Sequence, residues 1–334
     1  MAKHSVLVIG CGSIGERHLR CFQSTGRAEV TACDANPALL QRMAETYQVP
    51  VAADWQTALQ AKFNAVIICT PANLHVAMAT SALIAGSHVL VEKPLSHSLA
   101  GVDELIRTRD RTGRQVVVAY VLHVYALLAE AREFLRRGEF GPVCQATIVT
   151  GQSFPFFRPA YAQTYYRDRR TGGGAIQDAL THSVNWVESV LGPADSVLCD
   201  CAHLVLPNVE VEDTVHVSAR HGAALSTFAL NQFQQPNETI LQFNAAQGSV
   251  KIELHQQRWG TFGEGASDWT WHRVPAGERD TPFIAQANAF LDQLEGQPSR
   301  LCTLEAAAHT LRFNLAALAS ATSGQRVACA SLHA

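Results

Sequence analysis

The stretch that decides the fold lies near the start of the chain and reads Ser5-Val6-Leu7-Val8-Ile9-Gly10-Cys11-Gly12-Ser13-Ile14-Gly15. Residues 6–9 form a short apolar run typical of a buried strand, and a helical pattern follows over residues 15–25. Between them the three glycines have the spacing G-x-G-x-x-G. Here Gly10 permits a tight turn, Gly12 lets backbone N–H groups approach a pyrophosphate, and Gly15 lets helix and strand pack closely. We therefore predict a dinucleotide cradle that also includes Ser13 and Ile14. A glycine-rich turn without a ligand is the alternative.

The alternation of strand and helix patterns continues to about residue 120. Predicted strands cover residues 6–9, 29–33, 65–69, 88–91 and 115–119, and predicted helices cover 15–25, 37–47, 74–85 and 99–112. Continuous apolar strands separated by helices are typical of a parallel sheet buried on both faces. The sequence therefore predicts an α/β, doubly wound Rossmann domain over residues 1–122.

The pattern changes after Tyr120. Strands with alternating polarity are predicted at 143–150, 196–201, 214–219, 224–230, 238–244 and 249–254, and helices at 125–137, 175–191, 282–294 and 303–323. Clustered strands of this kind favour a largely antiparallel sheet. We expect residues 123–334 to form a second, α+β domain, as a length of 334 residues also suggests.

Composition argues against several classes of partner. The chain has 26 basic and 29 acidic residues with no block of like charge, which argues against nucleic acid and anionic membranes as partners. Its nine cysteines include no C-x-x-C pair, so zinc ribbons and thioredoxin-type redox motifs lack support. No uninterrupted apolar window of about 18 residues and no signal peptide is evident. We expect a cytoplasmic protein that binds a small molecule.

The acidic residue Asp34 follows the second predicted strand, nineteen residues after Gly15. A carboxylate there can accept hydrogen bonds from the adenosine ribose hydroxyls and would repel a 2′-phosphate. No arginine follows in Ala35-Asn36-Pro37, so NAD is favoured over NADP. An N-cap role for Asp34 before Pro37 fits the same position.

Polar residues also follow two further strands. Thr70, Pro71, Asn73 and His75 come after one strand, and Glu92-Lys93-Pro94 follows the next. Ligands of open α/β sheets bind beyond the carboxyl ends of the strands. We therefore assign all of these except Pro94 to the cofactor site, with Lys93 also facing the substrate.

Several motifs follow one another along the chain: the glycine fingerprint at 10–15, Thr70-Pro71 with His75, Glu92-Lys93-Pro94, Gly172-Gly173-Gly174, Asp178 with His182, and the C-terminal tail from Leu304. Together they resemble the Gfo/Idh/MocA family of NAD(P)-dependent oxidoreductases, which includes glucose–fructose oxidoreductase and inositol dehydrogenases. The resemblance implies a second domain with a large open sheet, which often forms the interface of a dimer or tetramer. It also implies that Lys93 lies near the nicotinamide and the substrate hydroxyl, before a cis Lys93–Pro94 peptide.

Asp178 and His182 are four residues apart in a predicted helix, a spacing that places both side chains on one face. The carboxylate can orient the imidazole while the histidine handles a proton. We expect His182 to transfer the hydroxyl proton, with Lys93 polarising the hydroxyl or relaying the proton. A surface pair and a metal site are the alternatives; no third ligand is evident, so we predict no metal.

Four further side chains are candidates for substrate binding. Tyr120 precedes the run Val121-Leu122-His123, where many family members carry an arginine, and His123 either faces the substrate or merely begins a helix. Tyr165 and Arg167 lie in an aromatic and basic segment, residues 161–170, that either binds an acidic or phosphorylated sugar or is a solvated charge run.

Three functions remain open at this stage. The first is an NAD-dependent dehydrogenase acting on a ring hydroxyl of a sugar, sugar acid, cyclitol or nucleotide sugar. The second is a hydrolase or lyase that keeps NAD bound and oxidises its sugar substrate transiently. The third is a non-catalytic NAD-binding regulator, against which the presence of Lys93, Asp178 and His182 argues.

Overall fold

A computed structural model describes residues 3–275 and 277–332. Contacts divide the chain into two compact units. The N-terminal unit comprises the residues up to Val124 together with Gly277–Ala307, and the C-terminal unit comprises Tyr125–Ala276 and Ala308–Ala334. We expected one break near residue 122, with everything after it in the second domain. The contacts instead group Gly277–Ala307 with the N-terminal unit.

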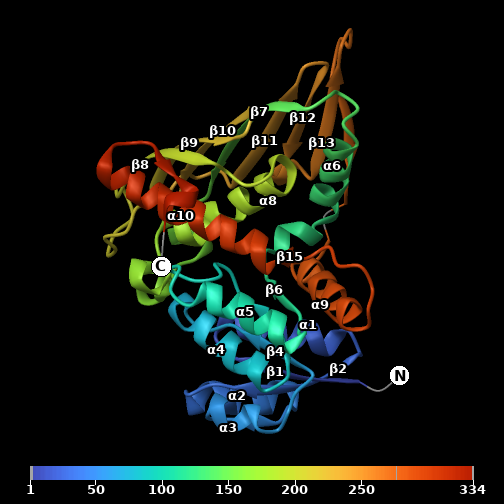
Figure 1. Cartoon of the computed structure of the whole chain (residues 1–334), viewed down its shortest axis with the longest axis vertical. Coiled ribbons are helices and arrows are strands. Elements are labelled where there is room, and N and C mark those ends of the chain that lie inside the picture. The colour runs from blue at the N-terminus through green and yellow to red at the C-terminus, as the bar shows by residue number, and fades with distance from the viewer. Residues whose placement is uncertain (1–2, 276, 333–334) are drawn as a thin grey trace. The chain divides into compact units, whose positions relative to one another are not determined.

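The N-terminal unit is built on one sheet with the strand order β15-β6-β5-β4-β1-β2-β3 (Figure 1). Its strands are β1 (His4–Ile9), β2 (Ala28–Cys33), β3 (Val51–Ala52), β4 (Ala65–Ile68), β5 (His88–Val91), β6 (Val116–Val118) and β15 (Cys302–Thr303). Its helices are α1 (Ser13–Ser24), α2 (Pro37–Tyr47), α3 (Trp55–Leu59), α4 (Ala72–Ile84), α5 (Val102–Thr112) and α9 (Thr281–Leu294). All strand pairs are parallel except β15 with β6. The predicted doubly wound parallel sheet is confirmed.

The apolar runs that predicted these strands are the core of the unit. Val6, Leu7 and Val8 have no exposed surface, and every residue of β4 is buried. Strands covered on both faces by helices need apolar residues at consecutive positions, because neither face meets water. The two-residue strands β3 and β15 and the five-residue helix α3 are too short to show such a pattern, so the sequence did not indicate them.

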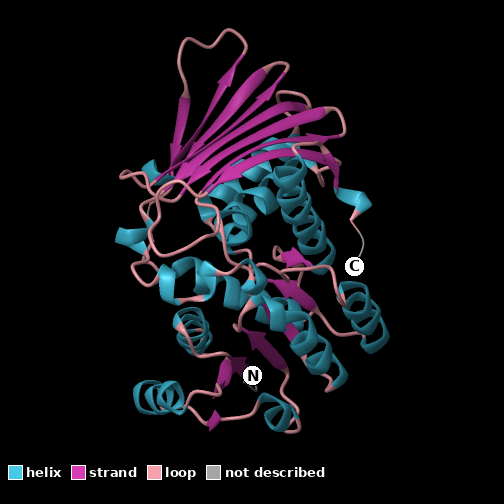
Figure 2. Cartoon of the chain, turned by 90° about the vertical axis from the view of Figure 1, so that its left-hand side faces the viewer, coloured by secondary structure: helices cyan, strands magenta, loops and turns pink. Residues whose placement is uncertain are grey.

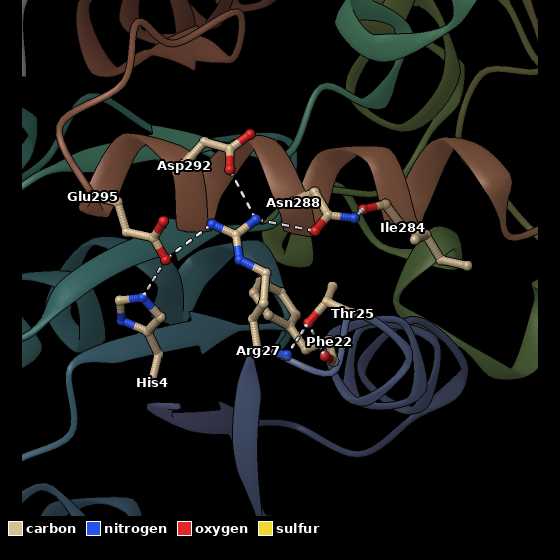
Figure 3. Close-up of polar contacts among 8 residues, drawn as sticks. All are labelled: His4, Phe22, Thr25, Arg27, Ile284, Asn288, Asp292 and Glu295. Atoms are coloured by element: carbon tan, nitrogen blue, oxygen red, sulfur yellow. Dashed lines mark hydrogen bonds and ion pairs between the residues drawn. The ribbon is translucent and has the colours of Figure 1, made fainter. Parts of the chain in front are cut away.

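Arg27 is one of the residues that tie α9 to the rest of the N-terminal unit. Figure 3 shows its guanidinium between three side chains of the α9 segment. Nη1 donates to Asn288 Oδ1 at 3.1 Å and pairs with Asp292 Oδ1 at 2.8 Å, while Nη2 pairs with Glu295 Oε1 at 3.0 Å. His4 Nε2 approaches the same Glu295 oxygen at 3.0 Å. These contacts connect segments more than 250 positions apart, so no local pattern predicts them.

The C-terminal unit is built on a nine-stranded sheet, counted over the described residues, with the order β14-β13-β12-β11-β7-β10-β9-β8-β16. The strands are β7 (Val143–Gly151), β8 (Ser196–Ala202), β9 (Thr214–His221), β10 (Ala224–Asn231), β11 (Glu238–Ala245), β12 (Gly248–Glu253), β13 (Arg258–Gly263), β14 (Thr270–Arg273) and β16 (Val327–Ala328). Only β7 and β10 pair in parallel among them. The predicted mostly antiparallel sheet is confirmed.

Helices cover one face of this sheet, as Figure 2 shows. The helical segments of the unit are α6 (Ala126–Arg137), α7 (Phe154–Phe157), α8 (Thr181–Leu191) and α10 (Leu304–Ser323), the last from Ala308 onward. Along β9 and β10 buried and more exposed positions alternate, as expected when one face packs on helices. On the other face Val149, Leu198 and Leu225 are each more than 40% exposed. In the part of the chain that the structure describes, no helix is long and apolar enough to cross a bilayer.

The structure of this unit differs from the prediction in the regularity of one helix and in elements that were not predicted. The helix expected over residues 175–191 is not one regular helix, because Ile176–Leu180 forms a π-helical turn before α8 begins at Thr181. Strands β13 and β14 were not expected, because Gly260 and Gly263 interrupt the apolar alternation of β13. The register shows why glycine suits residue 260: a Cβ there would lie 2.8 Å from the Trp271 ring on β14.

Glu188 on α8 provides a test of the packing of α8 against α10. Its Oε2 accepts a hydrogen bond from Thr310 Oγ1 at 2.6 Å, and burial raises the pKa of its carboxyl group to about 7. The folded protein therefore holds a proton that the unfolded chain releases near pH 4.5. We expect wild type to lose on the order of 1–3 kcal/mol of unfolding free energy relative to Glu188→Gln between pH 5 and pH 8.

Urea titrations of both proteins across that pH range measure this difference. A difference in unfolding free energy that stays constant with pH would show that Glu188 titrates normally in the folded protein.

Candidate active site

The glycine loop lies between the end of β1 and the start of α1. Gly10 has φ +91°, and a Cβ there would lie 2.8 Å from the Cys69 carbonyl oxygen. A Cβ at Gly15 would overlap the Gly10 carbonyl oxygen, whereas a Cβ at Gly12 would meet nothing within 4 Å. The first turn of α1, which includes Ser13 and Ile14, receives no side-chain cap. An α-helix leaves its first N–H groups without a partner in the helix, so an uncapped N-terminus beside the open space at Gly12 suits a pyrophosphate.

Asp34 holds this loop in place. Its Oδ2 accepts from Cys11 N at 2.7 Å, and its Oδ1 accepts from Asn36 N at 2.8 Å. Asn36, not Asp34, caps α2, because Asn36 Oδ1 accepts from Ala38 N at 3.0 Å. The structure therefore decides against the N-cap role for Asp34. Its carboxylate lies at the carboxyl end of β2, next to the glycine loop, as a ribose-binding residue requires.

His75 connects the loops that follow β4 and β5. Its Nδ1 lies 2.9 Å from the Pro94 carbonyl oxygen and its Nε2 lies 2.8 Å from the Thr70 carbonyl oxygen. Burial lowers the pKa of His75, and its contacts with the two carbonyls oppose that shift. Because the ring is only 1% exposed, this geometry favours a positioning role over the direct cofactor contact that we expected. The Lys93–Pro94 peptide is cis, as the family resemblance implied.

Glu92 is engaged by protein on both oxygens. Oε1 lies 2.7 Å from His18 Nε2, and Oε2 accepts from Lys93 N at 3.0 Å. His18 and Glu92 are both buried, so this contact is shielded from solvent. His18 was not among the site residues predicted from the sequence. Its position, one helical turn after Gly15 in α1, was a signal, because that turn lies near the strand ends. Glu92 therefore positions the backbone at Lys93, and both of its oxygens are engaged with protein instead of facing the cofactor as we expected.

The remaining candidates after β4 and β5 are more accessible. Asn73 and Pro71 are exposed at the start of α4, and Thr70 and Lys93 are half-buried. Thr70 Oγ1 contacts Met78 Sδ at 3.5 Å. Together with Gly12 and Asp34, these residues lie at the carboxyl edge of one parallel sheet, where such sheets bind ligands.

The triple glycine of the C-terminal unit is packed against two buried groups. A Cβ at Gly173 would overlap the Tyr166 carbonyl oxygen, and a Cβ at Gly174, where φ is +91°, would lie 2.5 Å from Glu212 Oε1. Glu212 accepts from Ile176 N at 3.1 Å and from Arg169 Nε at 2.9 Å. The glycines therefore let the π-helical turn approach a buried carboxylate.

Asp178 lies in this π-helical turn and is 1% exposed. Its Oδ1 accepts from the Tyr165 hydroxyl at 2.6 Å, and its Oδ2 accepts from Arg158 Nη1 at 3.1 Å. Tyr165 was expected to bind substrate, and the structure shows it donating to Asp178. Arg158 was not a sequence candidate, because twenty residues separate it from Asp178. A π-helical turn in an otherwise regular helix frequently marks a functional site, and this one carries the acid of the predicted aspartate–histidine pair.

The other candidates differ in exposure. Tyr120 and His123 are buried, at 1% and 7% exposed, in the N-terminal unit. His182 is half-buried at the start of α8, and Arg167 is exposed. Over the described ranges 3–275 and 277–332, no group of three or more His, Cys, Asp or Glu side chains could hold a metal ion.

Two family models match the chain. Residues 4–120 match the oxidoreductase family model with an NAD-binding Rossmann fold, and residues 128–255 match the GFO/IDH/MocA C-terminal domain. The chain belongs to the Gfo/Idh/MocA oxidoreductase family. The resemblance found in the sequence is confirmed, and so is the NAD-binding Rossmann domain.

Individual relatives are similar at low identity. An uncharacterized oxidoreductase of Synechocystis sp. is 27% identical over 168 residues, covering 46% of this chain and 44% of that protein. A myo-inositol dehydrogenase of Streptomyces leeuwenhoekii is 25% identical over 96% of this chain and 98% of its own length. The crystal structure of the WlbA dehydrogenase from Bordetella pertussis, in complex with NADH and UDP-GlcNAcA, has a TM-score of 0.82 at 22% identity, covering 98% and 99% of the two chains. This structure shows a shared fold.

The space beside Gly12 provides a test of the cofactor cradle. We expect Gly12→Ala to keep the wild-type melting temperature, because its Cβ meets no protein atom, but to weaken NADH binding about tenfold or more by obstructing the pyrophosphate. Gly15→Ala is the contrasting variant, since its Cβ overlaps the Gly10 carbonyl and lowers the melting temperature itself.

Thermal unfolding without ligand and NADH fluorescence titration separate the two effects. If Gly12→Ala binds NADH as tightly as wild type, the pyrophosphate does not bind beside Gly12.

Proposed function

We propose that this protein is an NAD-dependent dehydrogenase that oxidises a secondary ring hydroxyl of a sugar, sugar acid, cyclitol or nucleotide sugar. The observation that carries the proposal is the fixed Glu92-Lys93-Pro94 loop at the carboxyl edge of an NAD-binding Rossmann sheet. Relatives support the substrate class: one is named a myo-inositol dehydrogenase, and WlbA was crystallised with a nucleotide sugar.

NAD is the preferred dinucleotide in this proposal. The space beside Gly12 is open enough for the pyrophosphate of a dinucleotide. The Asp34 carboxylate lies next to the glycine loop, where it accepts from Cys11 N. A second phosphate on the ribose would meet this negative charge at close range, which disfavours NADP. Lys93, Thr70, Pro71 and Asn73 would line the nicotinamide end.

Side chains of the protein accept and transfer the proton of the substrate hydroxyl. When bound, NAD supplies a hydride acceptor at the nicotinamide ring. In the proposal, His182 takes the hydroxyl proton as the carbonyl forms, and the Asp178 carboxylate stabilises the resulting imidazolium. Lys93 polarises the substrate oxygen or relays the proton. Tyr120, His123 and Arg167 remain proposed substrate contacts.

A spectrophotometric screen tests this function. Sugars, sugar acids, cyclitols and nucleotide sugars are offered with NAD and NADP in parallel, and we expect reduced nicotinamide to accumulate with NAD for at least one substrate. Substrate conversion without net NADH would instead indicate the transient-oxidation hydrolase or lyase. NADH binding without conversion of any substrate would favour the regulator, and reduction of NADP alone would contradict the role of Asp34.

The variant His182→Ala then tests the proton transfer with the best substrate. We expect kcat to fall about 100-fold or more, the usual contribution of a general base, with little change in NADH affinity. Unchanged turnover would remove His182 from the catalytic residues.

The uncovered face of the C-terminal sheet suits a second copy of the chain, and we propose that it forms the interface of a dimer or tetramer. A groove of about 710 Å³ is lined by residues of β7, β8, β9 and β10, among them Val149 and Leu198, and by Ala321 and Gly324 at the end of α10. Val149, Leu198 and Leu225 are 46%, 41% and 42% exposed. Several exposed apolar side chains on one sheet face are typical of an interface.

Light scattering after gel filtration tests this interface. We expect the mass of wild type in solution to be two or more times the monomer mass of 36.2 kDa. The mass of Leu198→Glu should shift toward that of the monomer. Ile84→Glu, at a residue of α4 that is 67% exposed, is the matched control and should keep the wild-type mass. A monomeric wild type would contradict the assignment of this face.

A further inference from the structure

We propose that Arg158 and Tyr165 form a clamp that keeps the Asp178 carboxylate ionised and fixed, so that both are positioning residues for proton transfer. This inference rests on the proposed function, in which Asp178 supports His182. It assigns roles that the sequence did not indicate: Arg158 was not a candidate, and Tyr165 was expected to contact substrate.

The clamp is defined by two hydrogen bonds to a buried acid. Asp178 is 1% exposed, and its two oxygens accept separately from the Tyr165 hydroxyl at 2.6 Å and from Arg158 Nη1 at 3.1 Å. A buried carboxylate is unfavourable unless a positive charge or hydrogen-bond donors compensate it. Arg158 supplies the charge and Tyr165 supplies a second donor, so the ionised, acceptor-only form of Asp178 is favoured.

The arginine is itself held in place. Its guanidinium lies over the Phe154 ring at 5.1 Å from the centroid, and its backbone N donates to the Phe154 carbonyl at 2.7 Å. The Asp178 carboxylate raises the pKa of Arg158, with smaller contributions from Tyr165 and Tyr166. Phe154 and Tyr166 are buried in one apolar cluster of the C-terminal unit. Arg158 therefore approaches Asp178 from a segment anchored in this cluster, although its own side chain is 48% exposed.

The tyrosine is anchored by its backbone. The Tyr165 carbonyl accepts from Asp168 N at 3.2 Å and from Thr171 Oγ1 at 2.8 Å. These bonds fix the segment immediately before the triple glycine, while Asp178 N donates to the Gly174 carbonyl at 2.9 Å just after it. Donor and acceptor are thus attached to opposite sides of the same glycine turn.

A neighbouring pair shows what a purely structural arrangement looks like in the same loop. Arg169 pairs with Glu212, which is 1% exposed, and Glu212 accepts from the backbone N of Ile176 at the start of the π-helical turn. Glu212 therefore stabilises the backbone at the start of the π-helical turn. Asp178 differs because it lies four residues before His182, where an ionised carboxylate can stabilise an imidazolium.

The experiment compares Arg158→Gln, Arg158→Lys and Tyr165→Phe with the wild-type holoenzyme, using the best substrate of the screen. We expect Arg158→Gln to lower kcat about 10- to 100-fold with NADH affinity unchanged, and to move the acidic limb of the kcat/KM profile to higher pH. Arg158→Lys should restore most of both, because it keeps the charge. Tyr165→Phe should lower kcat about 5- to 10-fold, because it removes only one hydrogen bond.

Two matched controls separate positioning from folding. Arg170 pairs with Asp168 in the same segment but its side chain is 88% exposed, so Arg170→Gln should behave as wild type. Arg169→Gln removes the partner of Glu212, so it should lower the melting temperature without moving the acidic limb.

The outcomes distinguish this inference from the function on which it rests. If wild type converts no substrate, the proposed function fails, whether or not NADH binds. If wild type is active and Arg158→Gln keeps its kcat and pH profile, the clamp is overturned. It is also overturned if the variant loses activity only with its melting temperature, without a shift of the acidic limb and without rescue by lysine. Should Arg158→Gln not fold, Tyr165→Phe decides by the same readouts.

Discussion

Helix α1 approaches the turn after β1 so closely that residue 15 has no room for a side-chain carbon. This approach places the uncapped N-terminus of α1 at the carboxyl edge of the sheet, where its N–H groups can meet a pyrophosphate. One turn further along the same helix, His18 reaches the buried Glu92 that holds the backbone of Lys93. The cradle for the cofactor and the loop that carries the proposed catalytic lysine therefore depend on one close contact.

In the N-terminal unit, the groups that support the candidate site are buried and engaged with protein, while the groups proposed to meet ligands are more accessible. His75 and Glu92 are under 10% exposed: His75 bonds to the loops that follow β4 and β5, and Glu92 bonds to His18 of α1 and to the backbone N of Lys93. In contrast, Asn73 is exposed and Lys93 is half-buried. The C-terminal unit differs, because there Asp178 is 1% exposed while the two side chains that bond to it, Tyr165 and Arg158, are 39% and 48% exposed. Side chains fixed in this way preorganise a site, because little rearrangement remains to be made when a ligand binds.

Much of the fold could be predicted because it follows from local pattern. The parallel sheet is evident from consecutive apolar residues such as those of β4, and the antiparallel sheet from the alternation along β9 and β10. Short strands such as β15 and the glycine-interrupted β13 escaped prediction, because too few residues carry the periodic signal. For the candidate site, order and spacing predict the glycine loop, Lys93 and the Asp178 motif, and of these predictions the NAD-binding Rossmann domain is confirmed.

The sequence by itself determined the two architectures, the cofactor class and the family, because each is encoded in periodicity or in motifs of a few residues. Tertiary structure alone decided which side chains support them. Arg27 ties α9 to the N-terminal unit from more than 250 positions away, His18 reaches Glu92 across 74, and Arg158 reaches Asp178 across 20. Such partners depend on where the packed core places each element, and that placement cannot be read from the spacing of residues along the chain.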